Sequence, residues 1–201
     1  MEVNLDKQYQ LDVDTTRAWA LLTDLKAVAS CMPGAEITEQ LSDISYKGAV
    51  KVKVGPAVAQ FGGTVDVIEA VTSERKMVLR GKGADKGGSS ASMDLTAIIT
   101  SHPSNPLHCV LNGQAALIVN GKFAQFGGRL MVQVSDMLLA QFVENFRQTA
   151  LSLPTANGAP SETAHDAASS KAPVVAKEIN GLAIFWSLVK SWFGSLLGKK
   201  V

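Results

Sequence analysis

The residues that could do catalytic or metal chemistry are few and lie far apart in the sequence. The three histidines, His102, His108 and His165, have spacings and surroundings that fit no metal site. The stretch GKGADKGG at 81–88 resembles a phosphate loop only in its glycines, because it lacks the P-loop and the dinucleotide-binding patterns. No GxSxG motif marks a nucleophile. We therefore expect no catalytic residues, no metal, no covalently bound cofactor, and a protein that is not an enzyme.

The composition is that of a soluble globular protein without a strong overall charge. The 201 residues are 46% hydrophobic and 18% charged, and a formal net charge of +1 gives no attraction to nucleic acid. Cys31 and Cys109 have no CxxC or metal-type spacing, so we interpret them as free thiols that pack in a reducing compartment. The first residues lack a basic segment followed by an apolar one, so we expect no signal peptide and a cytoplasmic protein.

Hydrophobic periodicity divides residues 1–153 into a strand, helices, several strands and a long helix. The first strand is predicted over 3–13, a helix over 15–27, and a short helical turn that ends at Met32-Pro33-Gly34. From there to residue 119 apolar residues mostly alternate with polar ones, which predicts an antiparallel sheet with one face in water. After Gly121 the period is helical. The predicted fold class is α+β, with a curved antiparallel sheet wrapped on a long C-terminal helix.

A curved sheet that grips a long helix can leave an apolar cavity between the two. Gly127 is expected on the sheet-facing side of the helix, where a glycine costs about 1 kcal/mol and needs close packing or a ligand in compensation. Methionine side chains adapt well to irregular ligands. The alternative, that these side chains simply fill the core, stays open. The predicted pocket residues are Phe61, Met77, Leu79, Met93, Leu95, Phe123, Phe126, Gly127, Leu130, Met131, Val134 and Met137.

The end of the chain has a composition different from that of the body. Residues 154–177 are rich in Pro, Ala, Ser and Thr and are predicted to be a flexible linker to a tail at 178–201. Drawn as a helix, the tail has one continuous apolar face, whereas small polar residues and Lys190 form the other. We interpret the tail as an amphipathic helix that lies on a membrane. The predicted membrane-binding residues are Leu182, Phe185, Trp186, Leu188, Val189, Trp192, Phe193, Leu196 and Leu197.

Two other interpretations of the tail stay open. About twenty helical residues reach roughly 30 Å, which is long enough to span a bilayer. The Leu, Ile, Val and Phe residues contribute roughly −2 to −5 kcal/mol to insertion, however, and Lys190 near the centre costs about +2.5 to +3.5 kcal/mol. A spanning helix is therefore marginal. The remaining interpretation is a helix that docks on the protein's own body or on a partner.

Several glycine motifs resemble those of a known family. They are Met32-Pro33-Gly34, Tyr46-Lys47-Gly48, Gly55-Pro56, Phe61-Gly62-Gly63, Gly81-Lys82-Gly83 and the stretch GKFAQFG at 121–127. With the order of elements over residues 1–150, they resemble the CoxG family of carbon monoxide dehydrogenase subunits, which belongs to the START-like (SRPBCC) helix-grip superfamily of hydrophobic-ligand binders. The resemblance implies a bacterial protein that accompanies a molybdenum hydroxylase of the carbon monoxide dehydrogenase type. It also implies a link to membrane attachment of that enzyme and no redox metal of the protein's own.

Three functional hypotheses follow from these observations. In the first, the body carries an isoprenoid quinone or a lipid, the tail holds it at the cytoplasmic face of the inner membrane, and the protein connects the hydroxylase to the respiratory quinone pool. In the second, the protein is a ligand-free recruitment or assembly factor for that enzyme. The third, an enzyme acting on a bound apolar substrate, has the least support. The expected partners are the membrane, the hydroxylase and a hydrophobic small molecule, with no nucleic acid.

Deletion of residues 179–201 should leave the body folded and abolish flotation with liposomes on a density gradient. The double variant W186D/F193D should float almost as poorly, because the apolar face supplies most of the binding and each lysine adds only about 1 kcal/mol on anionic lipid. Unchanged flotation of either variant would refute the anchor.

Overall fold

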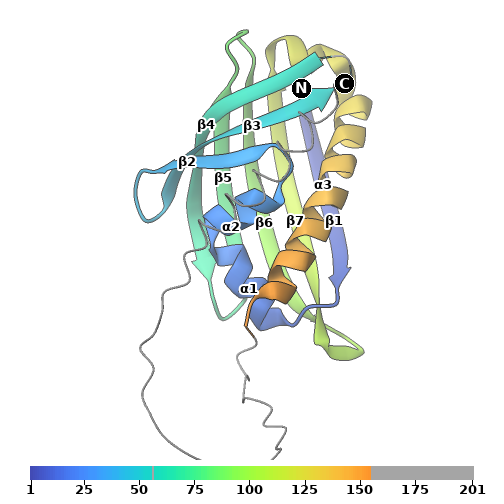
Figure 1. Ribbon diagram of the computed structural model, residues 1–201. Coiled ribbons are helices and arrows are strands. Elements are labelled where there is room, and N and C mark those ends of the chain that lie inside the picture. The colour runs from blue at the N-terminus through green and yellow to red at the C-terminus, as the bar shows by residue number, and fades with distance from the viewer. Residues whose placement is uncertain (56, 155–201) are drawn as a thin grey trace, which may run out of the picture. The chain divides into compact units, whose positions relative to one another are not determined.

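The computed structural model describes residues 1–55 and 57–154. The predicted linker, apart from Pro154, and the tail with its predicted membrane-binding residues lie outside these residues and stay predictions. Figure 1 shows one sheet and the helices that cover it. The elements are β1 (Glu2–Leu11), α1 (Thr15–Thr23), α2 (Leu25–Cys31), β2 (Ala35–Gln40), β3 (Ser45–Val54), β4 (Ala57–Val71), β5 (Lys76–Ala84), β6 (Ser90–His102), β7 (Asn105–Asn120), the 3-10 helix η1 (Gly121–Phe126) and α3 (Gly127–Ser152).

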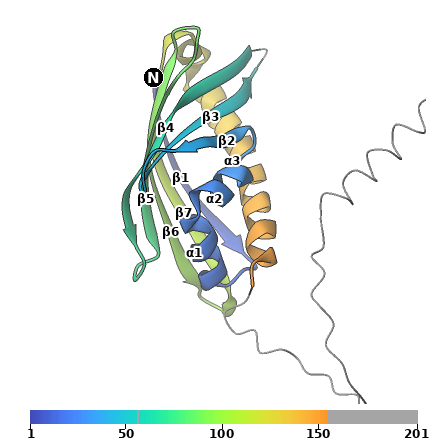
Figure 2. The same ribbon diagram turned by 60° about the vertical axis from the view of Figure 1, so that its left-hand side comes forward.

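All neighbouring strands of the sheet are antiparallel, in the order β1-β7-β6-β5-β4-β3-β2. From β2 to β7 the strands follow one another as a meander, and β7 then pairs with β1 along the whole length of that strand. The helices α1 and α2 therefore carry the chain from one edge of the sheet to the other. Figure 2 shows that the sheet is curved and that the helices lie on its concave side. The predicted fold class is confirmed.

Two aspartates begin the short helices. The carboxylate of Asp14 accepts hydrogen bonds from the backbone N–H groups of Thr16 and Arg17, at 3.0 and 2.9 Å, and so caps α1. Asp24 does the same for α2 through Lys26 and Ala27. The single helix predicted over 15–27 is therefore wrong at its end, because the extended backbone of Asp24 stops α1 and caps a second helix.

The long helix begins later than its sequence period indicates. Residues 121–126 form η1, and α3 starts at Gly127, whose φ of 80° is a left-handed conformation that glycine adopts without strain. Gly127 is exposed, and a Cβ atom at this position would meet no atom within 4 Å. Its predicted place on the sheet-facing side of the helix is wrong, because it forms the joint between η1 and α3.

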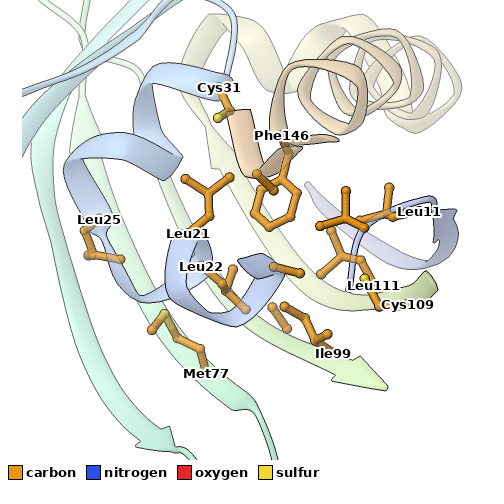
Figure 3. Close-up of a cluster of buried hydrophobic side chains, with 14 residues drawn as sticks. Leu11, Leu21, Leu22, Leu25, Cys31, Met77, Ile99, Cys109, Leu111 and Phe146 are labelled. Carbon is orange, nitrogen blue, oxygen red and sulfur yellow. The ribbon is translucent and has the colours of Figure 1, made fainter. Parts of the chain in front are cut away.

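One half of the core lies under α1 and α2. Phe146 of α3, Leu21 and Leu22 of α1 and side chains of the central strands point toward one another there (Figure 3). We call this group the α1 cluster. Its buried members are Leu11, Val13, Ala18, Leu21, Leu22, Leu25, Cys31, Met77, Ala97, Ile99, Cys109, Leu111, Phe146 and Ala150.

The other half of the core lies under η1 and the first turns of α3. Phe123 is its largest buried side chain, with ring centroids of Phe61 and Phe126 at 5.7 and 6.1 Å from its own. We call this group the η1 cluster. Its buried members are Val3, Ala59, Val119, Phe123, Met131 and Val134.

Both cysteines are buried and free, as the sequence predicts. Burial raises the pKa of the Cys109 thiol to about 11, and burial also raises the pKa of Cys31. Neither thiol ionises near neutral pH, so both act as packing groups in the α1 cluster.

Replacing Phe146 with Ala should lower the free energy of unfolding by about 3–5 kcal/mol, because the ring is fully buried and its loss leaves a cavity between α1 and α3. Urea denaturation followed by circular dichroism measures this loss. The control is Q141A, at an exposed position of the same helix, which should stay within about 0.5 kcal/mol of the wild type. Equal losses in the two variants would contradict the assignment of Phe146 to the core.

Candidate functional site

The middle of the sheet's concave face lies between the two clusters. Along each strand buried and exposed positions alternate, and we call the positions that face the helices inward. At these positions the register places Gly81 beside Met93 and Leu95 beside Ala115. Gly113 is the next inward position of β7. Met93, Leu95 and Ala115 are half-buried and belong to neither cluster. We call Gly81, Met93, Leu95, Gly113 and Ala115 the central band.

Open space lies in front of the central band. A Cβ atom built at Gly81 or at Gly113 would meet no neighbouring atom within 4 Å. Gly63, at an inward position of the neighbouring strand β4, is different, because its Cβ atom would lie 1.9 Å from the carbonyl oxygen of Lys82. Glycine at position 63 therefore permits a close backbone approach, whereas the glycines at 81 and 113 leave room that a side chain could fill.

A second feature is an open depression of about 510 Å³ beside η1. Its lining is mostly apolar, and the ammonium group of Lys122 lies 5.1 Å from the centre of the Phe123 ring. We call it the η1 depression. Its lining residues are Ala57, Val58, Lys122, Phe123, Gln125 and Phe126.

A smaller depression of about 360 Å³ lies on β1 and β7. Four of its six lining residues are at outward register positions, so it belongs to the outer face of the sheet and not to the predicted pocket: Asn4, Asp6, Gln114 and Ala116.

Ion pairs fix α3 along the edge strand β1. Lys7 is the one charged residue at an inward position of the described strands, and its ammonium group lies 2.8 Å from Asp136 of α3. That hydrogen bond raises the pKa of Lys7, so its ammonium group stays charged. Arg147 of α3 likewise reaches Asp12, just after β1, at 3.3 Å. These two ion pairs hold α3 on the side of β1. On the side of α2, the Asn145 side chain of α3 donates a hydrogen bond to the carbonyl oxygen of Cys31 at 3.0 Å.

The structure distributes the predicted pocket residues over the two clusters and the central band. Met77 and Leu79 pack in or against the α1 cluster, and only Met93 and Leu95 are in the central band. Met137 belongs to neither cluster and is 50% exposed, because Val134 and Leu138 occupy the positions of α3 that face the sheet. The members that pack in or against the η1 cluster are Phe61, Phe123, Phe126, Leu130, Met131 and Val134.

Sequence reasoning missed Gly81 and Gly113 as site residues. The signal was available, since both glycines interrupt strands of alternating polarity, where glycine is unfavourable. Without the register, however, nothing distinguishes them from Gly63, which has the opposite role.

The chemistry available in the described part of the chain is sparse. The rings of His102 and His108 lie 6.0 Å apart across the β6–β7 turn, but no three His, Cys, Asp or Glu side chains of the described residues come together as metal ligands would. Residues 1–55 and 57–154 also contain no helix with the length and hydrophobicity to cross a bilayer. The candidate site is an apolar band with open space in front of it.

Comparison with known proteins gives one family. The model of the CoxG family of carbon monoxide dehydrogenase subunits matches residues 8–151. A search among curated proteins gave no significant match.

Solved structures with a similar fold have low sequence identity. A conserved protein from Geobacillus kaustophilus is 17% identical over 74% of this chain and 95% of its own, with a TM-score of 0.66. A START superfamily protein from Mycobacterium smegmatis is 11% identical, with coverages of 74% and 97% and a TM-score of 0.55. The Zhui aromatase/cyclase from Streptomyces sp. R1128 is 10% identical, with coverages of 75% and 94% and a TM-score of 0.56. These likenesses establish a START-like fold.

The open space at the central band predicts opposite changes in the free energy of unfolding when Gly81 and Gly63 are each replaced with Ala. Replacing Gly81 with Ala should raise the free energy of unfolding by about 0.4–1 kcal/mol, because the unfolded chain loses freedom and no native contact is disturbed. Replacing Gly63 with Ala should lower it by more than about 1 kcal/mol, since the new Cβ atom collides with backbone. Urea denaturation compares the two, and a loss at Gly81 equal to that at Gly63 would show that the space is filled.

Proposed function

Because the chain belongs to the CoxG family of carbon monoxide dehydrogenase subunits, we propose that it carries an apolar ligand between sheet and helix for a molybdenum hydroxylase of the carbon monoxide dehydrogenase type. The observation that carries this proposal is the open central band. Two inward glycines with free space in front of them lie between two well-packed clusters. A protein that needed only a packed core would gain stability from larger side chains at these positions.

The ligand class that fits best is a long apolar molecule, such as an isoprenoid quinone or a lipid. The side chains of the central band are those of Met93, Leu95 and Ala115, which offer dispersion contacts and no polar groups. The lining of the η1 depression, at one end of the concave face, is again mostly apolar. Methionine adapts its side chain to irregular shapes, which suits a flexible ligand.

A carrier is favoured over an enzyme by the charges of the concave face. Lys7 is the one charged residue at an inward position of the described strands, and it is paired with Asp136. General acid–base catalysis needs a titratable group within hydrogen-bond reach of the substrate, and a pair of such groups in most cases. The START-like fold does not decide the question, because one of the similar structures is named an aromatase/cyclase.

The proposed place of action is the cytoplasmic face of the inner membrane, where the predicted tail at 178–201 would hold the body. An interfacial tail would bring a quinone carrier to the pool from which it loads. The alternative function is a ligand-free recruitment or assembly factor, in which the central band stays empty and the hydroxylase is the sole partner.

Filling the central band should remove the ligand without removing the fold. Organic extraction of the purified full-length chain, followed by mass spectrometry, should recover a quinone or lipid from the wild type and much less from G81L. The matched control is G62L, because Gly62 also has open space around it but lies on the outer face of the sheet. Recovery should be unchanged in this control.

Equal recovery from both variants would place the ligand elsewhere. No ligand from the wild type, together with pull-down of a hydroxylase, would support the recruitment factor instead.

A further inference from the structure

Exposed basic side chains gather at one end of the body. Three segments meet there that are far apart in the sequence: the β3–β4 connection, the β5–β6 turn and η1 with the start of α3 (top of Figure 1). We call this the basic end. Its exposed basic residues are Lys51, Lys53, Lys82, Lys86, Lys122 and Arg129.

Few carboxylates oppose these charges. Lys122 is paired with Asp85, at 3.1 Å. Among the described residues, none of the other five basic side chains has a carboxylate oxygen within 4 Å. Glu2 lies at the start of β1, and Asp94 of β6, which is paired with Arg80, also interacts with the charge of Lys82. The formal net charge of the whole chain is only +1, so the excess of positive charge is local.

Apolar groups lie among the basic ones. The η1 depression opens at this end, and Phe126 in its lining is half-buried. Val58, which pairs with Lys53 across the β3–β4 hairpin, is 55% exposed. An exposed apolar patch surrounded by lysines suits a membrane surface, because the lysines can contact anionic headgroups while the apolar side chains reach the boundary of the hydrocarbon region.

We propose that the basic end docks directly on an anionic lipid bilayer, with Val58 and Phe126 in the headgroup region and the η1 depression open to the membrane. An anionic membrane is favoured over an acidic protein because the centre of the surface is an aromatic depression that lipid chains can enter. The inference rests on the proposed membrane location but not on the tail, since the contact is made by the body.

Vesicle binding of full-length variants tests the charges. The variant K53E/K86E is compared with K26E/K47E, which changes the net charge by the same amount at exposed positions away from the basic end. On phosphatidylcholine vesicles containing phosphatidylglycerol, K53E/K86E should bind at least about thirtyfold more weakly than the wild type, because each lysine near an anionic surface strengthens binding about fivefold. The control should bind within about threefold of the wild type, and on pure phosphatidylcholine the three proteins should bind alike.

A fluorescent label tests the orientation. Both natural cysteines are buried, so a single exposed cysteine can be labelled with an environment-sensitive nitrobenzoxadiazole dye. The dye at V58C should shift to shorter wavelength and brighten when anionic vesicles are added. The dye at L41C, which is 50% exposed in the β2–β3 turn, should not change.

The outcomes separate this inference from the proposed function. Equal binding of K53E/K86E and its control, or equal dye responses at positions 58 and 41, would overturn docking through the basic end while leaving a tail-held carrier intact. Loss of vesicle binding in K53E/K86E without loss of extracted ligand would support the docking surface on its own. No binding of the wild type to any vesicle would overturn the docking surface and the membrane location together.

Discussion

The packing of α3 across the concave face of the sheet is the interaction on which the rest of the structure depends. One helix serves both halves of the core, with Met131 and Val134 in the η1 cluster and Phe146 and Ala150 in the α1 cluster. Val134 and Phe146 are twelve residues apart, which at the helical rise separates them by about 18 Å. Leu138 and Phe142, between these two residues on the helix, pack against the η1 cluster and the α1 cluster respectively. The same helix therefore contacts both clusters, and the open central band lies on the sheet between them.

Glycine makes this arrangement costly in stability. Within a strand, a glycine lowers the free energy of unfolding by about 0.5–1 kcal/mol relative to alanine. At Gly81 and Gly113 neither a close contact nor a positive φ angle requires glycine. At Gly63 and at the η1–α3 joint, by contrast, the backbone itself requires glycine. A stability cost without a structural reason is expected where a binding site has to stay open. Under the proposed function, the two inward glycines, and not the methionines, are the positions that keep space for a ligand on the concave face.

The sequence predicted the parts that depend on local period, and it failed where tertiary contacts decide. Alternation predicted the antiparallel sheet, and helical period predicted a long last helix. The joint at Gly127 and the break at Asp24 were missed, because a left-handed backbone and a second cap have no periodic signature. The period of Met137 fits the apolar face and predicts a place in the pocket, yet the helix turns its side chain outward. The division of the core into two clusters depends on register, which no single strand reveals.

The basic end shows that the placement of charges, like the division of the core, depends on tertiary structure. It also bears on how a body held by the predicted tail would be oriented on a membrane. A formal net charge of +1 excludes a strong overall field, but it does not describe how charges are placed. Here three segments that are distant in sequence bring their basic residues to one end. A flexible linker of the predicted length has a root-mean-square reach of about 25–30 Å, so a tail alone would localise the body without orienting it. Orientation requires a second contact with a preferred direction, which charges confined to one end can supply at distances up to the Debye length, about 8 Å at physiological salt. Localisation and orientation would then come from separate parts of the chain, the first from apolar burial and the second from charge, and only the second would weaken as the salt concentration rises.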